Sequence, residues 1–549
     1  MCGIFLLVKS YYRHISIDLR QATTLYSKLS KRGPDQSNLT LYGNDILGFH
    51  RLSINDLSEK GLQPFSDNIG NYLMCNGEIY NHKDLESRHN ITPTSRSDCE
   101  CLLPLIRDRG IDSISAPTGR LSEAISAPTG RLSEAISEID GVFAIVAKIG
   151  CKYYFIRDRI GVKPLFMYKC DDFIAAASDP SALEFDNPGG SIVEVEPGTV
   201  VECDFSFNIS VSRYYTVPNN PQESLETTQD EIISTTRKLL WNAVEKRLMS
   251  DRPLGCLLSG GLDSSIISAV VAKIYRDRGQ KLNTFSVGFS DSIDLKYARK
   301  VAEHIGSNHH ELIITPKGAV STIPSIVRNI GTWDITTIRA STPMWLLCQW
   351  ISHNFPEKVL FSGEGADEVF GGYLYFHSAP TPEEFTTECG RLVSELYKYD
   401  VLRADRCISG NSLDLREPFL DKDLIDYYLR LPSKYRIPVD GYEKWILRKA
   451  FDDMLPREVC WRRKTAFSDG ISSSEKPWYK YIQEWTDSMF DETDLGEFKT
   501  TESKWYHMLF KSNYKVYNPR VSYWLPKWQG NNVLDPSATT LKIWNKQEH

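Results

Sequence analysis

The pattern of predicted strands and helices changes near residue 230, and this change decides what the chain can fold into. Residues 1 to about 205 hold short strand-like segments such as CGIFLLV, NYLMCNGEIY and GVFAIVAKI, separated by turn residues. From about residue 230, apolar strands alternate with helical segments, as in PLGCLLS, SSIISAVVAKIYRDRG and LNTFSVGF. Such alternation predicts βαβ units and a parallel sheet. We expect domains at 1–205 and 230–549, joined by a linker at 206–229 that is rich in Pro, Asn and Thr.

The composition argues against nucleic-acid and membrane partners. The net charge is -7 at pH 7, which does not suit binding to a phosphate backbone. No apolar stretch reaches the ~20 residues that a helix needs to cross a bilayer. The 12 cysteines lack CxxC pairs and zinc-ligand spacing, so we expect mostly buried, reduced thiols and a cytoplasmic location.

The segment SAPTGRLSEAI occurs at 115–125 and again, identically, at 126–136. A solenoid needs at least about three repeats, so two copies indicate a tandem duplication in a loop. We expect residues 115–136 to form a surface insert of the first domain without a catalytic role.

The segment LLSGGLDSS at 257–265 lies between a predicted strand and a predicted helix. A turn there can aim backbone N–H groups and the positive end of the helix at an anion. Gly260 and Gly261 would let phosphate oxygens approach the backbone, and Ser259 and Ser264 would add hydroxyl donors. Asp263 beside phosphates requires a divalent cation between them. The Gly-Lys-Ser/Thr of a P-loop is missing, so the pattern favours a departing pyrophosphate over γ-phosphoryl transfer; the alternative is an ordinary Ser/Gly turn.

A second glycine-rich turn, VLFSGEGADEVFGGY at 359–373, also follows an apolar strand. Loops that leave the carboxyl ends of adjacent parallel strands meet over one crevice, where ligands bind. Ser362 and Gly363 would join the nucleotide site there, Asp367 would hold Mg²⁺ together with Asp263, and Glu364 would remain free for proton transfer. A solvated acidic loop is the alternative.

Cys2 has three interpretations. A signal peptide is excluded because no positive charge precedes the short apolar run at 4–8. The thiol is then either an ordinary buried one or a nucleophile that becomes N-terminal once Met1 is removed. Only partner residues elsewhere in the chain separate these two.

Ordered motifs along nearly the whole chain resemble two known domain types. MCGI, RGPD (32–35), HRLSI (50–54), NGEIYNH (76–82), the Ser-Asp pair at 97–98, DGVFA (140–144) and RDRIGVKPLF (157–166) resemble a class II, N-terminal-nucleophile glutamine amidotransferase. SGGLDSS, DITTIRAS (334–341), SGEGADE, VLRADR (401–406) and AFSDGI (466–471) resemble the PP-loop ATP pyrophosphatase domain of glutamine-hydrolysing asparagine synthetases. This implies an αββα sandwich, followed by an α/β parallel-sheet domain of the adenine nucleotide α-hydrolase type with added helices.

The resemblance implies roles in the first domain. The α-amino group of a mature N-terminal Cys2 would activate its own thiol to attack glutamine. The Asn76 side chain and the Gly77 backbone N–H would form the oxyanion hole. Arg51 would clamp the glutamine α-carboxylate with two hydrogen bonds. Glu78 and Asp98 would hold the α-ammonium group of glutamine. The implied glutamine-binding residues are Arg51, Leu52, Ser53, Ile54, Asn55, Asn76, Gly77, Glu78 and Asp98.

In the second domain the resemblance implies that aspartate attacks ATP to give β-aspartyl-AMP and pyrophosphate, and that ammonia then yields asparagine. Glu364 would act as the base for ammonia, and Lys464 would balance phosphate charge. The implied ATP-binding residues are Leu257, Ser259, Gly260, Gly261, Asp263, Ser264, Val287, Ser362 and Gly363, and Mg²⁺ would be held by Asp263 and Asp367. The resemblance also allows a homodimer.

Two positions depart from the family pattern: Thr465 stands where a carboxylate is usual, and Glu417 where an aliphatic residue is expected. Two other functions are compatible with this architecture. A β-lactam synthetase-like enzyme would join a different acceptor, but such relatives usually lose the N-terminal cysteine. A non-catalytic relative would have lost site residues, and none is lost here.

Overall fold

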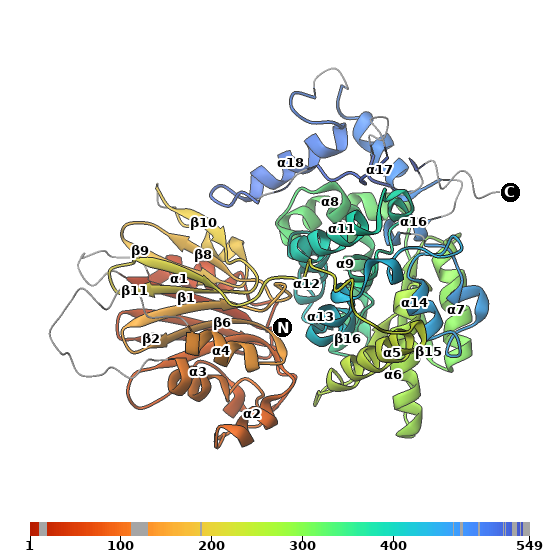
Figure 1. Cartoon of the computed structure of the whole chain (residues 1–549). Helices are drawn as coiled ribbons and strands as arrows, with labels where there is room; N and C mark the ends of the chain where they lie inside the picture. The colour runs from red at the N-terminus through yellow and green to blue at the C-terminus, as the bar shows by residue number, and fades with distance from the viewer. Residues whose placement is uncertain are drawn as a thin grey trace. The chain divides into compact units, whose positions relative to one another are not determined.

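A computed structural model describes residues 1–9, 19–110, 130–186, 189–464, 466–472, 476–491, 495–519, 521, 523–529, 535–537 and 540–541. The chain forms two compact units (Figure 1): Met1–Thr216 with Val516–Asn518, and Val217–Lys515 with Pro519–His549. Thr465 and residues 111–129, which include most of the duplicated segment, lie outside the described residues.

The first unit contains two antiparallel sheets. The first has the order β10 (Ser191–Glu194), β8 (Phe166–Lys169), β9 (Phe173–Ala177), β1 (Gly3–Lys9), β3 (Asp45–Arg51), β2 (Gln36–Tyr42). The second has the order β12 (Ile209–Arg213), β11 (Thr199–Asp204), β7 (Lys152–Arg157), β6 (Gly141–Ile149), β5 (Tyr72–Ile79), β4 (Phe65–Ser66).

Alternation along the strands builds two apolar layers in this unit. Ile4 and Leu6 of β1 face the other sheet and share a core with Met74 of β5. Leu73 and Cys75, the neighbours of Met74, point the other way, into a core with α2 (His82–Arg88), α3 (Leu102–Gly110) and α4 (Gly130–Glu138). The α1 helix (Leu19–Ser27) lies on the outer face of the first sheet. Gly48 of β3 leaves room for the Tyr26 ring of this helix, because a Cβ atom on Gly48 would lie 2.6 Å from the ring. The predicted αββα sandwich is confirmed.

The second unit is built on a five-stranded sheet whose strands all run parallel, as the βαβ pattern predicted. Its order is β15 (Asn308–Ile313), β14 (Asn283–Gly288), β13 (Leu254–Leu257), β16 (Val359–Phe361), β17 (Asp414–Arg416). The chain builds outward from β13 to β15 and then returns to the other side of β13, so β13 and β16 flank the point where the order reverses. Ligands bind at such a point in open α/β sheets.

Helices surround this sheet and extend beyond it (Figure 1). They are α5 (Gln229–Lys246), α6 (Leu262–Asp277), α7 (Ile293–Ile305), α8 (Pro316–Ile330), α9 (Ile335–Asn354), α10 (Ala366–Phe370), α11 (Pro382–Glu395), α12 (Asp400–Ser409), α13 (Lys422–Arg430), α14 (Trp445–Ala450), α15 (Arg457–Cys460), α16 (Phe467–Gly470), α17 (Trp478–Asp487) and α18 (Thr501–Asn513). Most long helices begin with a side-chain cap; at α9, Asp334 accepts the Thr337 N–H at 2.7 Å. The α6 helix has no such cap, so the N–H groups of its first turn remain available to a ligand. In the described part of the chain, no helix is long and apolar enough to cross a membrane.

Candidate functional site

Cys2 lies directly before β1 and contacts the second sheet. Its backbone N–H donates to Asn76 Oδ1 at 2.8 Å, and its Sγ lies 3.9 Å from the Leu52 carbonyl oxygen. The RGPD motif supports this end of the strand, because Arg32 Nε donates to the Cys2 carbonyl at 3.0 Å. Burial raises the pKa of the Cys2 thiol. A nucleophile here therefore needs a nearby base before it can react.

Asn76 and Gly77, predicted as the oxyanion hole, lie in the middle of β5. Asn76 is fully buried, and its Nδ2 has no hydrogen-bond partner within the described structure. An unpaired buried donor costs about 1–3 kcal/mol, so it points to a ligand that would accept the bond. Gly77 has no room for a side chain, since a Cβ atom there would lie 2.2 Å from the Val142 carbonyl oxygen. The two residues can supply adjacent donors beside Cys2.

Three predicted glutamine-binding residues meet in one cluster, in which Glu78 and Asp98 are buried and Asn55 is partly buried. Asn55 Nδ2 donates to Glu78 Oε2 at 2.8 Å and to Asp98 Oδ1 at 3.2 Å. Asp98 Oδ2 accepts the Ile79 N–H at 2.8 Å, which fixes the carboxylate against β5. Two carboxylates held together in this way offer a binding place for an ammonium group. Leu52, Ser53 and Ile54 are also buried, in the loop that follows β3.

Arg51, predicted to clamp the glutamine α-carboxylate, already has hydrogen-bond partners on its guanidinium group. Its two terminal nitrogens already donate to Gln36 Oε1 (2.8 Å), Ser58 O (2.6 Å), Asn55 O (3.1 Å) and Asp56 O. A carboxylate could be held by both terminal nitrogens only if these bonds were exchanged. In this arrangement Arg51 instead fastens the loop that carries Asn55, and a clamp on substrate is not preformed.

In the second unit, the loops that follow β13 and β16 line one cavity of about 270 Å³. They touch each other, because a Cβ atom on Gly363 would lie 2.7 Å from Ser264 N. The predicted residues on the cavity wall are Leu257, Ser259, Gly261, Asp263, Ser264, Val287, Ser362, Gly363, Glu364, Asp367 and Lys464. Gly260 does not line the cavity. It has φ +79° and packs against α7, where a Cβ atom on it would lie only 2.4 Å from Ala298 N.

Hydroxyl groups and helix N–H groups converge at the start of α6. Ser264 Oγ lies 3.0 Å from Ser259 Oγ and accepts the Ser259 N–H at 3.2 Å. Together with the uncapped helix end, this loop presents donors and a positive dipole to the cavity. Such an arrangement suits a phosphate group.

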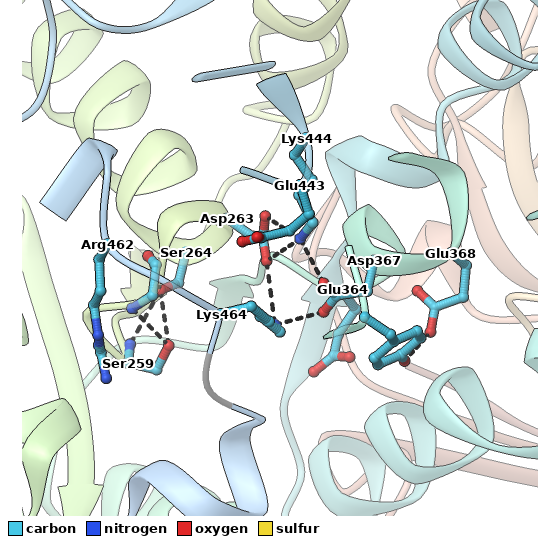
Figure 2. Close-up of polar contacts among 12 residues, drawn as sticks. Ser259, Asp263, Ser264, Glu364, Asp367, Glu368, Glu443, Lys444, Arg462 and Lys464 are labelled. Atoms are coloured by element: carbon cyan, nitrogen blue, oxygen red, sulfur yellow. Dashed lines mark hydrogen bonds and ion pairs between the residues drawn. The ribbon is translucent and has the colours of Figure 1, made fainter. Parts of the chain in front are cut away.

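Two lysines and two aspartates form an alternating charge cluster beside this loop (Figure 2). Lys444 Nζ lies 2.7 Å from both Asp263 oxygens and 2.6 Å from Asp367 Oδ1. Lys464 Nζ lies 2.6 Å from Asp367 Oδ2 and 3.6 Å from Asp263 Oδ2. Although burial alone would raise it, the two ammonium groups lower the pKa of Asp367 to about 2. Lys444 was not among the residues singled out from the sequence.

Glu364, the predicted base, faces the same cavity and pairs with Arg403 of α12. Arg403 Nη2 donates to Glu364 Oε2 at 2.7 Å and to Asp400 Oδ1 at 2.6 Å. Burial raises the pKa of Glu364, and Arg403 only partly offsets this effect. The VLRADR motif was recognised in the sequence, but this contact was not foreseen.

The described residues contain no group of three or more His, Cys, Asp and Glu side chains arranged to hold a metal. Mg²⁺ needs less, because it is usually held by one or two carboxylates together with the phosphates of a substrate. Asp263 and Asp367 both line the cavity and would supply that donor set, with the two lysines that they pair with beside the metal. The residues present fit Mg²⁺ that arrives with a nucleotide.

Comparison with known proteins gives matches over both units. Residues 1–127 match the family model described as a glutamine amidotransferase domain, and residues 235–388 and 379–529 match the model described as asparagine synthase. A probable glutamine-hydrolysing asparagine synthetase of Acanthamoeba polyphaga mimivirus is 39% identical over 99% of this chain and 100% of its own length. The glutamine-hydrolysing asparagine synthetase of Gallus gallus is 37% identical over 99% of this chain and 99% of its own length. That of Homo sapiens is 37% identical over 98% of this chain and 98% of its own length.

Proposed function

The chain belongs to the glutamine-hydrolysing asparagine synthetase family, and from this we propose that it makes asparagine from aspartate and ATP with nitrogen taken from glutamine. ATP would be cleaved to AMP and diphosphate, and glutamine to glutamate. The observation that supports glutamine hydrolysis is the buried Asn76 Nδ2 beside Cys2, which has no hydrogen-bond partner among the described residues. It is a donor without an acceptor, placed where attack by the thiol would create an oxyanion.

In the first unit we propose that removal of Met1 frees the Cys2 amine, which takes the thiol proton. The sulfur then attacks the glutamine side-chain carbonyl carbon, while Asn76 Nδ2 and the Gly77 N–H hold the developing oxyanion. The C–N bond breaks, the protonated nitrogen leaves as ammonia, and water hydrolyses the thioester to glutamate. Glu78 and Asp98 would hold the substrate ammonium group through the cluster they form with Asn55.

In the second unit we propose that the aspartate side-chain carboxylate attacks the α-phosphorus of ATP and releases diphosphate. Leu257 and Val287 would contact the adenine, while Ser259, Gly261 and Ser264 would bind the diphosphate with the N–H groups of α6. Lys464 would neutralise phosphate charge. Glu364 would take a proton from the attacking ammonia as AMP leaves the carbonyl carbon.

Several finer points belong to this proposal. Mg²⁺ would be held by Asp263 and Asp367 and would neutralise phosphate charge when bound. All twelve cysteines are free thiols, which supports a reducing, cytoplasmic location. We also propose small-molecule substrates as the main partners, without nucleic acid or membrane, and a homodimer as the assembly.

The test is a product assay on purified protein with aspartate, ATP and Mg²⁺, given either glutamine or an ammonium salt. We expect asparagine and AMP from both nitrogen sources. Cys2→Ala should lose synthesis from glutamine and keep synthesis from ammonium, because the two reactions use different units. Loss of both routes in a folded Cys2→Ala protein would contradict the proposed division of labour.

A further inference from the structure

Part of the wall of the synthetase cavity comes from the C-terminal segment of the chain. The described residues of this segment that line the cavity are Trp524, Pro526, Pro536, Ser537 and Leu541. They lie far in sequence from the two nucleotide loops, which end by about residue 371. The motifs recognised in the sequence did not include this segment.

Asp535 connects the segment to α9 through Arg339, a buried residue that also lines the cavity. Arg339 Nη1 donates to Asp535 Oδ1 at 2.9 Å, and Arg339 Nη2 donates to Asp535 Oδ2 at 2.8 Å. The other edge of the guanidinium donates to Glu502 Oε1 at 2.9 Å and to Glu502 Oε2 at 2.5 Å. Such two-pronged pairs are the most directional contacts that an arginine makes. The position of Asp535 is thereby tied to a helix of the cavity wall.

A second contact ties the same segment to another helix of the cavity wall. Ser537 Oγ donates to Asp469 Oδ1 at 2.9 Å, and Asp469 belongs to α16 and lines the cavity. Asp535 Oδ1 also accepts the Ser537 N–H at 2.9 Å, which sets the local turn. Gln483 of α17 adds a bond to Asp535 Oδ2 at 3.0 Å. The Asp535 carboxylate therefore accepts four hydrogen bonds, two from Arg339 of α9, one from Gln483 of α17 and one from the backbone of Ser537.

Two residues earlier in the segment, Lys527 and Trp528, contact α11. Lys527 Nζ lies 2.5 Å from Glu388 Oε2, and Trp528 Nε1 donates to Glu384 Oε2 at 3.1 Å. Four described residues of the segment are thus attached to α11, α9, α17 and α16: Lys527, Trp528, Asp535 and Ser537. With them in place the cavity keeps a volume of about 270 Å³, so the segment bounds the cavity and does not fill it.

We propose that Asp535 is a positioning residue for the synthetase reaction: through Arg339 it holds the neighbouring Pro536 and Ser537 at the cavity wall, where they keep water from the activated substrate. This inference rests on the proposed function, because the intermediate it protects is the mixed anhydride of aspartate and AMP. Water attacking the acyl carbon breaks the C–O bond to AMP and returns aspartate, so each such event consumes ATP without product. Excluding water from a site that holds a reactive intermediate prevents this side reaction.

The test measures AMP formed per asparagine formed, with ammonium salt as the nitrogen source. Wild-type protein should give a ratio near one. Asp535→Asn keeps the shape and loses the charge by which Arg339 holds this segment, and we expect the ratio to rise severalfold. Asp535→Glu keeps the charge and should restore much of the coupling. The matched control is Asp453→Asn, which breaks the exposed ion pair to Arg237 and should leave the ratio unchanged.

The ratio separates this role from simple loss of folded protein, which lowers AMP and asparagine together. Ser537→Ala removes the bond to Asp469 and leaves Asp535 in place, so it serves as the milder variant, with a smaller rise expected in the same direction. An unchanged ratio in both Asp535→Asn and Ser537→Ala would overturn the inference while leaving the proposed function standing. A wild-type protein that forms AMP and no asparagine from either nitrogen source would instead refute the proposed function itself.

Discussion

Asn76 offers the most specific test of the glutamine site, because its side-chain oxygen and nitrogen have different roles. Oδ1 accepts the Cys2 N–H at 2.8 Å, whereas Nδ2 has no partner within the described structure. Asn76→Asp keeps the acceptor and removes the donor at almost constant shape. Asn76→Ala removes both. If the donor matters, both variants must lose glutaminase activity.

The size of the effect follows from the geometry. Nδ2 makes no hydrogen bond to the described residues, so its removal breaks no contact among them, and the loss should fall on the transition state, where the oxyanion forms. Removing one oxyanion donor typically lowers kcat about 10²–10³-fold, which is about 2.7–4 kcal/mol. We expect a loss of this size in kcat with little change in KM.

The assay is glutamate release from glutamine, run beside asparagine synthesis from ammonium salt. Synthesis from ammonium should be unchanged, since the second unit is intact. Asn38→Asp is a suitable control, because Asn38 also donates through Nδ2, to the Gln63 carbonyl at 3.3 Å, and is not among the proposed glutamine-binding residues. If Asn76→Asp kept a wild-type kcat for glutamine, the side-chain amide would not be an oxyanion donor.

Three further predictions concern both units. Lys444→Met should lower the free energy of unfolding by about 3–5 kcal/mol in a denaturant titration, because it leaves two buried carboxylates with one ammonium group; a wild-type midpoint would contradict this. Burial raises the pKa of Glu364, so the carboxylate should lose its ionised, basic form at a higher pH than an ordinary glutamate does. The rate of synthesis at constant free ammonia should therefore fall with decreasing pH, and Glu364→Gln should abolish that limb, while a flat profile would argue against the base. Intact-protein mass spectrometry of active enzyme should find Met1 removed, and full activity with Met1 attached would exclude the amine as base.

The sequence was sufficient to predict that the two nucleotide loops meet. Each loop follows a short apolar strand, and β13 and β16 pair in parallel, with Leu254 opposite Val359. Because parallel strands end at one edge, the side chains after them must gather there. The same reasoning could not find Lys444, which lies 181 residues from Asp263 and outside any motif. Its place is decided by packing between distant helices, which leaves no local pattern.

Arg51 and Asp535 also make contacts that could not be predicted from the sequence, although only Arg51 lies in a recognised motif. A motif identified Arg51, but the hydrogen bonds it makes to the loop at 55–58 depend on how that loop closes. Asp535 lies 196 residues from Arg339 and gave no signal of its own. Sequence patterns identify side chains with suitable chemistry, whereas the partners of a charged group are decided by tertiary structure.

The most direct measurement of the central claim follows the nitrogen atom itself. Purified protein is given aspartate, ATP, Mg²⁺ and glutamine labelled with heavy nitrogen in its side-chain amide, in buffer that contains unlabelled ammonium. Mass spectrometry should find the label in the side-chain amide of newly formed asparagine, with one AMP for each asparagine. Glutamate release without labelled asparagine would contradict the account, because the two sites would then not serve one reaction.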